Sequence, residues 1–347
     1  MFVSRTKRRA FAASAAIALL IGCGGQGLRF APPPSNGAGT SYHARTAEKP
    51  GYNGSVFVSD VSNDSVWICP ANFHDIRNGF TFPTGQLFGV SSPVQIAVDS
   101  SGTVYVANSL VDASGAGSIT EYPRGQTSPS RTLTSGLYST SGVAVDSAGT
   151  VYASNKFLGS IEVFPKGKSA PTATITANLT GPDGLAADKA GNLFIADSSA
   201  NDVLKLAHGS KTPQSLHLAG LARPTGVAVD SHGTLYVGNL AGAASNVAAY
   251  PVGSRNPSRT MRVLGPRLGR GGGAIGEPLM LSIAPGDLLI ASAFFAMRSI
   301  KGQWVEYGPA ADGFMPGESR PAWIEYDQNY GPSQIIGYDD AVFAPAR

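Results

Sequence analysis

Apolar and polar positions alternate with a period of two through the middle of the chain, in a pattern that recurs four times. Each copy has an apolar run, a short polar turn, and a second apolar run that ends in Asn or Asp. This alternation predicts strands in which every second side chain faces a core. The copies occupy residues 96–108, 143–155, 185–197 and 227–239.

Successive copies begin 42 to 47 residues apart. Two further strand-like segments fit between successive copies. The first of them ends in an aromatic residue followed by Pro-x-Gly, as at residues 164–167 and 250–253. Repeats of this length built from short strands are typical of the four-stranded blades of a β-propeller. We therefore predict four strands in each repeat.

The first and second strands of each copy are joined by an Asp-x-x-Gly sequence, at residues 99–102, 146–149, 188–191 and 230–233. The Asp carboxylate can accept hydrogen bonds from the backbone amides of the turn, and Gly tolerates the left-handed conformation. We interpret these aspartates as structural.

The second strand of each repeat is expected to end in a polar residue, and these ends predict six blades. They are Asp60, Asn108, Asn155, Asp197, Asn239 and Ser292. The chain enters the first blade at its second strand, residues 55–60, so the missing first strand is expected from residues 332–338. Pairing of these two segments would close the ring and remove exposed sheet edges. We predict an all-β, six-bladed β-propeller over residues 54–347.

The first 22 residues have the pattern of an export signal. Four basic residues precede an apolar run over residues 11–21, which is too short to span a bilayer. The run ends at Cys23 in a sequence that resembles the bacterial lipobox, which implies cleavage before Cys23 and attachment of a lipid to its thiol. The alternative is an ordinary cleaved signal with a chance cysteine. Residues 23–53, rich in Gly, Pro and polar residues, are expected to be a flexible tether.

These features place the protein in the bacterial cell envelope, lipid-anchored and extracytoplasmic. Gly24 follows the cysteine in place of the Asp associated with inner-membrane retention, which favours the outer membrane. Four of the 26 Lys and Arg residues lie in the predicted signal, against 23 Asp and Glu in the whole chain. The mature chain is therefore nearly neutral and has no basic run, so nucleic-acid binding is not expected.

The repeated sequence resembles NHL repeats and the related gluconolactonase (senescence-marker-30) family of six-bladed propellers, most clearly over residues 90–260. The resemblance implies a ligand face around the central channel, formed by the connections between second and third strands and between blades. It also implies a metal site on that face that uses the Asp of a Pro-Asp-Gly motif, with Asn and Glu from other blades. Asp183, in the Pro-Asp-Gly of residues 182–184, matches that ligand. The implied cofactor is Ca²⁺ or another divalent cation.

The equivalent positions in the other repeats depart from this pattern. They are Val94, Ser141, Thr225, Leu279 and Ser333. One carboxylate with a few hydroxyls makes a poor divalent site, so Asp183 as a residue of the strand itself is the alternative to Asp183 as a ligand.

Two further groups of residues are candidates for ligand binding on the same face. The polar strand ends Asp60, Asn108, Asn155, Asp197 and Asn239 offer acceptors there, and their alternative role is to close turns by bonding backbone amides. The second group belongs to segments that exceed the repeat: Arg267, Arg270, Phe294 and Phe295. Loops longer than the scaffold requires often carry recognition. The alternative role of the two Phe residues is packing between blades.

No familiar catalytic motif is present: the sequence has neither a zinc-binding His pair nor a Gly-x-Ser-x-Gly element. The leading hypothesis is a non-catalytic, membrane-anchored propeller that binds a protein, a polysaccharide or a small ligand. The alternative is a metal-dependent lactone or ester hydrolase centred on Asp183. A third possibility is a scaffold with no small-molecule site.

Overall fold

The computed structural model describes residues 54–61, 64–70, 85–109, 115–241, 244–262, 264–267, 273–284, 288–295, 298–300, 303–305, 310–314, 323–326 and 338–345. All of them belong to one compact unit, Pro50–Arg347. Among these residues, no helix has the length and apolar character needed to cross a bilayer.

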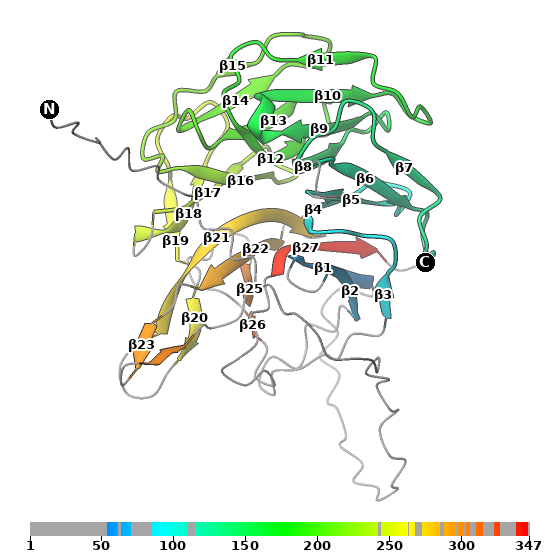
Figure 1. Cartoon of the computed structure of the whole chain (residues 1–347). Helices are drawn as coiled ribbons and strands as arrows, with labels where there is room; N and C mark the ends of the chain where they lie inside the picture. Colours follow the sequence, from blue (N-terminus) through cyan, green and yellow to red (C-terminus); the bar gives the residue numbers. More distant parts are fainter. Residues whose placement is uncertain are drawn as a thin grey trace, which may run out of the picture. The chain divides into compact units, whose positions relative to one another are not determined.

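The described chain is built from antiparallel sheets, five of which have four strands and form the blades of Figure 1. The first blade comprises β27 (Tyr338–Pro345), β1 (Gly54–Asp60), β2 (Ser65–Pro70) and β3 (Gly85–Leu87). The second comprises β4 (Pro93–Val98), β5 (Val104–Asn108), β6 (Ser118–Tyr122) and β7 (Arg131–Leu133).

The next three blades repeat this order along the chain. The third comprises β8 (Thr140–Val145), β9 (Val151–Asn155), β10 (Ser160–Phe164) and β11 (Ala173–Ile175). The fourth comprises β12 (Pro182–Ala187), β13 (Leu193–Asp197), β14 (Asp202–Leu206) and β15 (Gln214–Ser215). The fifth comprises β16 (Pro224–Val229), β17 (Leu235–Asn239), β18 (Asn246–Tyr250) and β19 (Arg259–Met261).

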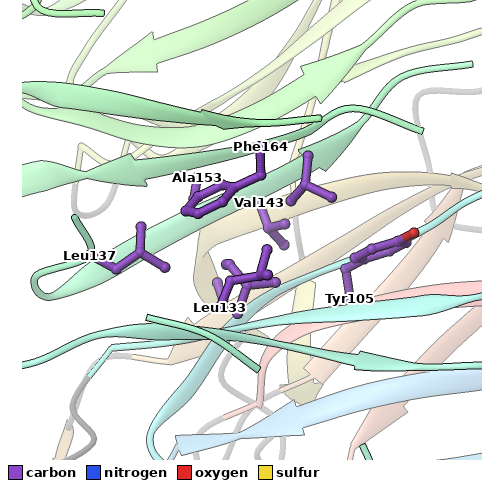
Figure 2. Packing of buried hydrophobic residues seen from close by; sticks show 9 residues of the cluster. Tyr105, Leu133, Leu137, Val143, Ala153 and Phe164 are labelled. Carbon is purple, nitrogen blue, oxygen red and sulfur yellow. The ribbon is translucent and has the colours of Figure 1, made fainter. Parts of the chain in front are cut away.

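The blades are held together by apolar side chains that fill the space between neighbouring sheets. Between the second and third blades, Tyr105 and Leu133 from one sheet pack with Val143, Ala153 and Phe164 from the other, as Figure 2 shows. Because a sheet in the middle of the series is covered on both faces, every residue of β5, β13 and β17 is buried. Similar clusters join the other neighbouring sheets.

The strand ends follow the sequence prediction in five repeats, since β1, β5, β9, β13 and β17 end at the five predicted Asn or Asp residues. The prediction of six four-stranded blades is wrong, because the described residues form five. The segment expected to form the sixth lacks the Asp-x-x-Gly turn, and its strands run on past the repeat length. It forms a five-stranded sheet and a separate hairpin: β20 (Leu264–Arg267), β21 (Gly273–Ala284), β22 (Leu288–Phe295), β25 (Ala310–Phe314) and β26 (Trp323–Tyr326), with β23 (Arg298–Ile300) and β24 (Gln303–Val305).

The C-terminal strand pairs with β1, the partner predicted for it, but it lies further along the chain. The pairing involves β27 rather than residues 332–338, of which only Tyr338 is among the described residues. The register runs from Gly54 opposite Pro345 to Asp60 opposite Tyr338. Figure 1 shows β27, in red, beside β1.

Two sets of connections lie at opposite ends of the strands, and we name the two faces after them. The loop face carries the connections from second to third strands and from one blade to the next. The turn face carries the Asp-x-x-Gly turns and the turns between third and fourth strands. We name the turns between third and fourth strands the outer turns. They lie over the Asp-x-x-Gly turns, since the side chains of Arg124, Lys166 and His208 lie close to Gly102, Gly149 and Gly191.

The Asp-x-x-Gly turns have the predicted conformation. Gly102, Gly149, Gly191 and Gly233 have φ between +79° and +83°, and each Asp Oδ1 accepts two backbone N–H bonds of 2.8–2.9 Å. In three turns a Tyr hydroxyl six residues on donates to Oδ2, as from Tyr236 to Asp230 at 3.0 Å. Burial, followed by the charge of the neighbouring Asp, raises the pKa of Tyr152 and of Tyr236 to about 12.

Candidate functional site

We call the first strand of each blade its inner strand. Asp183 lies at the start of β12, the inner strand of the fourth blade, where the pairing with β13 shifts register between Pro182 and Leu185. Its side chain is almost fully buried, and its Oδ2 accepts a hydrogen bond from Lys156 Nζ in a salt bridge. The Lys156 side chain comes from the preceding blade and is itself largely covered. The two charges therefore neutralise one another at the loop-face end of the inner strands.

The surroundings of Asp183 do not fit a divalent metal site. The Asp183 carboxylate is already paired with the Lys156 ammonium, which takes the place that a metal cation would occupy beside it. The equivalent residues Val94, Ser141 and Thr225 add at most two hydroxyl oxygens, and Ser141 Oγ lies 3.1 Å from Ser154 Oγ. In the described part of the chain, no three His, Cys, Asp or Glu side chains converge on a common point. Side chains of Leu279 and Ser333 fall outside the described set.

Gln95 ties three inner strands together, a role that the sequence analysis missed. Its Nε2 donates to the carbonyl of Leu185 at 2.9 Å, while its Oε1 accepts from the amides of Val143 and Leu185 at 3.0 and 3.1 Å. These bonds provide partners for two backbone amides and one backbone carbonyl of β8 and β12. The signal was visible in the sequence, because Gln95 stands where the later repeats have Gly142, Gly184 and Gly226.

Gly142 is required by this arrangement. A Cβ on Gly142 would lie 2.2 Å from the carbonyl oxygen of Asp183 and 2.7 Å from Ser154 Oγ. Ser154 Oγ donates to that same carbonyl at 2.7 Å. The inner strands β8 and β12 thus approach closely, and protein groups occupy the space between them.

The polar strand ends are buried and close the connections between blades. Asn108, Asn155 and Asn239 each accept one backbone amide of that connection, from Ser91, Tyr138 and Ala222 respectively, at 2.9–3.0 Å. Asp197 accepts three, from Thr180, Gly181 and Ala200, at 2.7–3.0 Å. These contacts are those of the turn-closing alternative. The side chain of Asp60 is not among those described.

The remaining predicted residues lie at the edge of the described structure or outside it. Arg267 ends β20, and Phe294 and Phe295 end β22, where they pair with Glu277 and Gly276 instead of forming a loop after the strand. The side chains of all three are outside the described set. Arg270 and Cys23 also lie outside the described residues.

A feature that the sequence analysis did not identify is an exposed apolar group on the loop face of the third blade, which we name the 157 patch. It consists of Phe157 and Leu158 in the short 3₁₀ turn Lys156–Leu158. Their exposed fractions are 75% and 57%. The signal was the sequence Lys-Phe-Leu-Gly at residues 156–159, directly after the polar strand end.

The 157 patch is held by contacts at both ends of its turn. Lys156 is fixed by Asp183, and Gly159 adopts the left-handed conformation, φ 60° and ψ 37°, that ends the turn. The amide of Tyr138 donates to Asn155 Oδ1 at 2.9 Å, which joins the connection before β8 to the turn. The patch therefore displays apolar side chains from an ordered backbone.

Comparisons with known proteins identify the fold. No family model matches the chain, and no match was found among curated proteins. A chain in the crystal structure of a nidogen/laminin complex superposes with a TM-score of 0.55 at 14% identity, over 84% of this chain and 98% of that one. A Bacteroides caccae protein of unknown function gives a TM-score of 0.54 at 12% identity, over 82% and 98%. At such low identity the likeness concerns the fold alone: the chain folds as an all-β β-propeller.

Proposed function

We propose that this protein is a membrane-anchored, extracytoplasmic propeller that binds a partner protein through the 157 patch, without catalysis. The observation that carries the proposal is the exposure of Phe157 and Leu158 on an ordered turn. Large apolar side chains that cluster on a surface commonly mark an interaction site. The propeller fold, which is often used for binding and scaffolding, is consistent with this role.

The chemistry of the patch favours a protein over a polysaccharide. Leu158 offers no ring face and no polar group to a sugar, and the ammonium of the adjacent Lys156 is paired with Asp183. A partner with an uncharged apolar cleft matches two consecutive apolar side chains better. Arg267, Arg270, Phe294 and Phe295 remain candidates for extending the contact toward the five-stranded sheet.

The cellular setting of the proposal comes from the N-terminal sequence. A lipid on Cys23 and a tether of about 30 residues would hold the domain near a membrane, with a root-mean-square reach of roughly 30 Å. Membership among NHL-like or gluconolactonase-like propellers is part of the same proposal. So is closure of the ring, which is supported by the pairing of β27 with β1 and by its contacts with β21 and β4.

A site-specific photocrosslinker at position 158 of the full chain, expressed in its own host, tests the binding role. We expect a discrete crosslinked adduct that disappears when Phe157→Ser is added. The matched control places the crosslinker at Phe88, an aromatic residue that is 53% exposed and belongs to a different blade. An adduct that forms equally from position 88, or that survives Phe157→Ser, would refute the role of the patch.

The alternative of a metal-dependent hydrolase rests on the Pro-Asp-Gly motif, and thermal unfolding distinguishes it. A ligand that binds only the native state raises the unfolding temperature. With Ca²⁺, Mg²⁺, Mn²⁺ or Zn²⁺ after chelation we expect no saturable rise, because Lys156 neutralises Asp183. A rise of several degrees with one ion, abolished by Asp183→Ala, would indicate a metal site at Asp183 and favour the hydrolase hypothesis, which hydrolysis of a panel of lactones would then test.

A further inference from the structure

The turn face presents a set of exposed cations that the near-neutral composition conceals. Lys166 and Lys168 belong to the outer turn of the third blade, and Lys189 to the Asp-x-x-Gly turn of the fourth. Lys211 and Arg255 occupy equivalent positions just after the outer turns of the fourth and fifth blades. All five side chains are exposed. The two salt bridges found among the described residues, Arg131–Glu121 and Lys156–Asp183, involve none of them.

The acidic residues of the same face are recessed. They are the four aspartates of the Asp-x-x-Gly turns, Asp99, Asp146, Asp188 and Asp230. Each is at least partly buried and has its carboxylate turned toward backbone amides, with a Tyr or Asn side chain also bonded to it. Among the described residues of this face, the outermost charges are consequently positive. The described connections of the loop face differ, because their exposed residues are mostly Ser, Thr, Gly, Ala and Asn.

The N-terminal part of the chain joins the domain on this face. β1 ends on the loop face, where Asp60 pairs with Ser65 across the hairpin to β2. Its first residues, Gly54 and Ser55, therefore lie at the opposite end, with Ser55 opposite Pro70. The proposed tether, residues 23–53, is attached to the side of the domain that carries the exposed cations.

We infer that the turn face docks on an anionic phospholipid bilayer, with Lys166, Lys168, Lys189, Lys211 and Arg255 against the headgroups. Basic side chains near an anionic membrane surface are attracted over about a Debye length, roughly 10 Å at moderate salt. A tether with a reach of roughly 30 Å keeps the face within range of the surface. Docking in this orientation directs the 157 patch away from the membrane. The inference rests on the proposed lipid anchor for its setting.

Vesicle cosedimentation of the chain from residue 23 onward, with Cys23→Ser to remove the lipid site, tests the inference. This chain contains the whole compact unit Pro50–Arg347. We expect it to bind vesicles of one third phosphatidylglycerol in phosphatidylcholine, and to be released at about 1 M salt, where the Debye length is about 3 Å. Vesicles of phosphatidylcholine alone should not bind it.

The decisive comparison is between two double variants of equal charge. Lys166→Gln/Lys168→Gln should weaken binding at least tenfold, since each basic residue near an anionic surface contributes several-fold. Arg223→Gln/Arg262→Gln, which removes two exposed cations away from the turn face, should change it less than twofold. Equal loss in the two variants, or equal binding to phosphatidylcholine alone, would overturn the docking. Incorporation of labelled fatty acid into the full chain, abolished by Cys23→Ser, tests the anchor separately.

Discussion

The two faces of the propeller use the same strands in different ways. On the turn face, four blades repeat one geometry: Asp at the start, left-handed Gly, and an outer turn lying over it. On the loop face, the connections differ from blade to blade, and only the third carries the exposed Phe157 and Leu158. The blades therefore share the geometry of their turns, whereas the connections of the loop face vary in sequence and in the side chains they expose.

The faces also differ in how they hold charge. The turn face keeps its carboxylates inward and its ammonium groups outward, so exposed charge varies without disturbing the turn. The loop face buries Asp183 against Lys156 and Asp197 against three amides, so these two charges are structural.

The largest effect is expected from Gly142→Ala at the loop-face end of the inner strands. The new methyl group would meet the Asp183 carbonyl at 2.2 Å, a distance that requires backbone movement. We expect the free energy of unfolding to fall by about 3 kcal/mol or more, measured by urea denaturation.

Gly167→Ala on the turn face is the control for that change. Its new methyl group would meet nothing within 4 Å, so the cost is limited to the positive φ of 75°, about 1–2 kcal/mol. If both variants lose the same stability, close approach of the inner strands is not the reason for Gly142.

The next effect compares two aspartates, one from each face. Asp197→Ala leaves three backbone amides without an acceptor, one of them in a buried and two in partly buried hydrogen bonds, so we expect a loss of about 2–3 kcal/mol. Asp188→Ala frees amides that water can reach, because Asp188 is only partly buried, and should cost about 1 kcal/mol. Chemical denaturation of both variants measures the two losses of unfolding free energy. A larger loss for Asp188→Ala than for Asp197→Ala would contradict the prediction.

The sequence predicted the parts of the fold that depend on local chemistry. Alternation, Asp-x-x-Gly and the terminal Asn or Asp are features of neighbouring residues, and they located five second strands and four turns correctly. The prediction of a sixth four-stranded blade was wrong, because its strands were inferred from weak copies of the repeat that lack the Asp-x-x-Gly turn. Gln95 and the Lys156–Asp183 pair were missed for a different reason: each joins residues from different blades, 27 to 90 positions apart. Spacing within one repeat carries no information about such contacts.

An alkaline titration tests the turn face through Tyr152 and Tyr236. Their pKa of about 12 lies above the ordinary value of 10, because burial and a neighbouring Asp disfavour the phenolate. Since the folded pKa is raised, their contribution to stability is complete below pH 10 and is lost as pH rises toward about 12. Absorbance of tyrosinate should show several late-ionising groups, because burial also raises the pKa of Tyr105, Tyr122 and Tyr250. Two of the late-ionising groups should disappear in Tyr152→Phe/Tyr236→Phe. Each Tyr→Phe change should cost about 1 kcal/mol at neutral pH.

The smallest effect on stability is expected where the proposed effect on binding is largest. Phe157→Ser/Leu158→Ser replaces side chains that are mostly exposed, so the free energy of unfolding should change by no more than about 0.5 kcal/mol. The control, Phe164→Ser, makes the same exchange at a fully buried residue between the second and third blades and should cost about 3–5 kcal/mol.

This pair of variants separates exposure from packing. Replacing a residue needed for the fold by a polar one lowers the free energy of unfolding. Replacing a residue that contacts a partner lowers only the binding of that partner. If Phe157→Ser/Leu158→Ser costs more than about 1 kcal/mol, the two side chains pack within the native protein, and the 157 patch is part of its core rather than a binding surface. If stability is unchanged while the crosslinked adduct is lost, the apolar pair acts in recognition and the loop face has been specialised at its third blade.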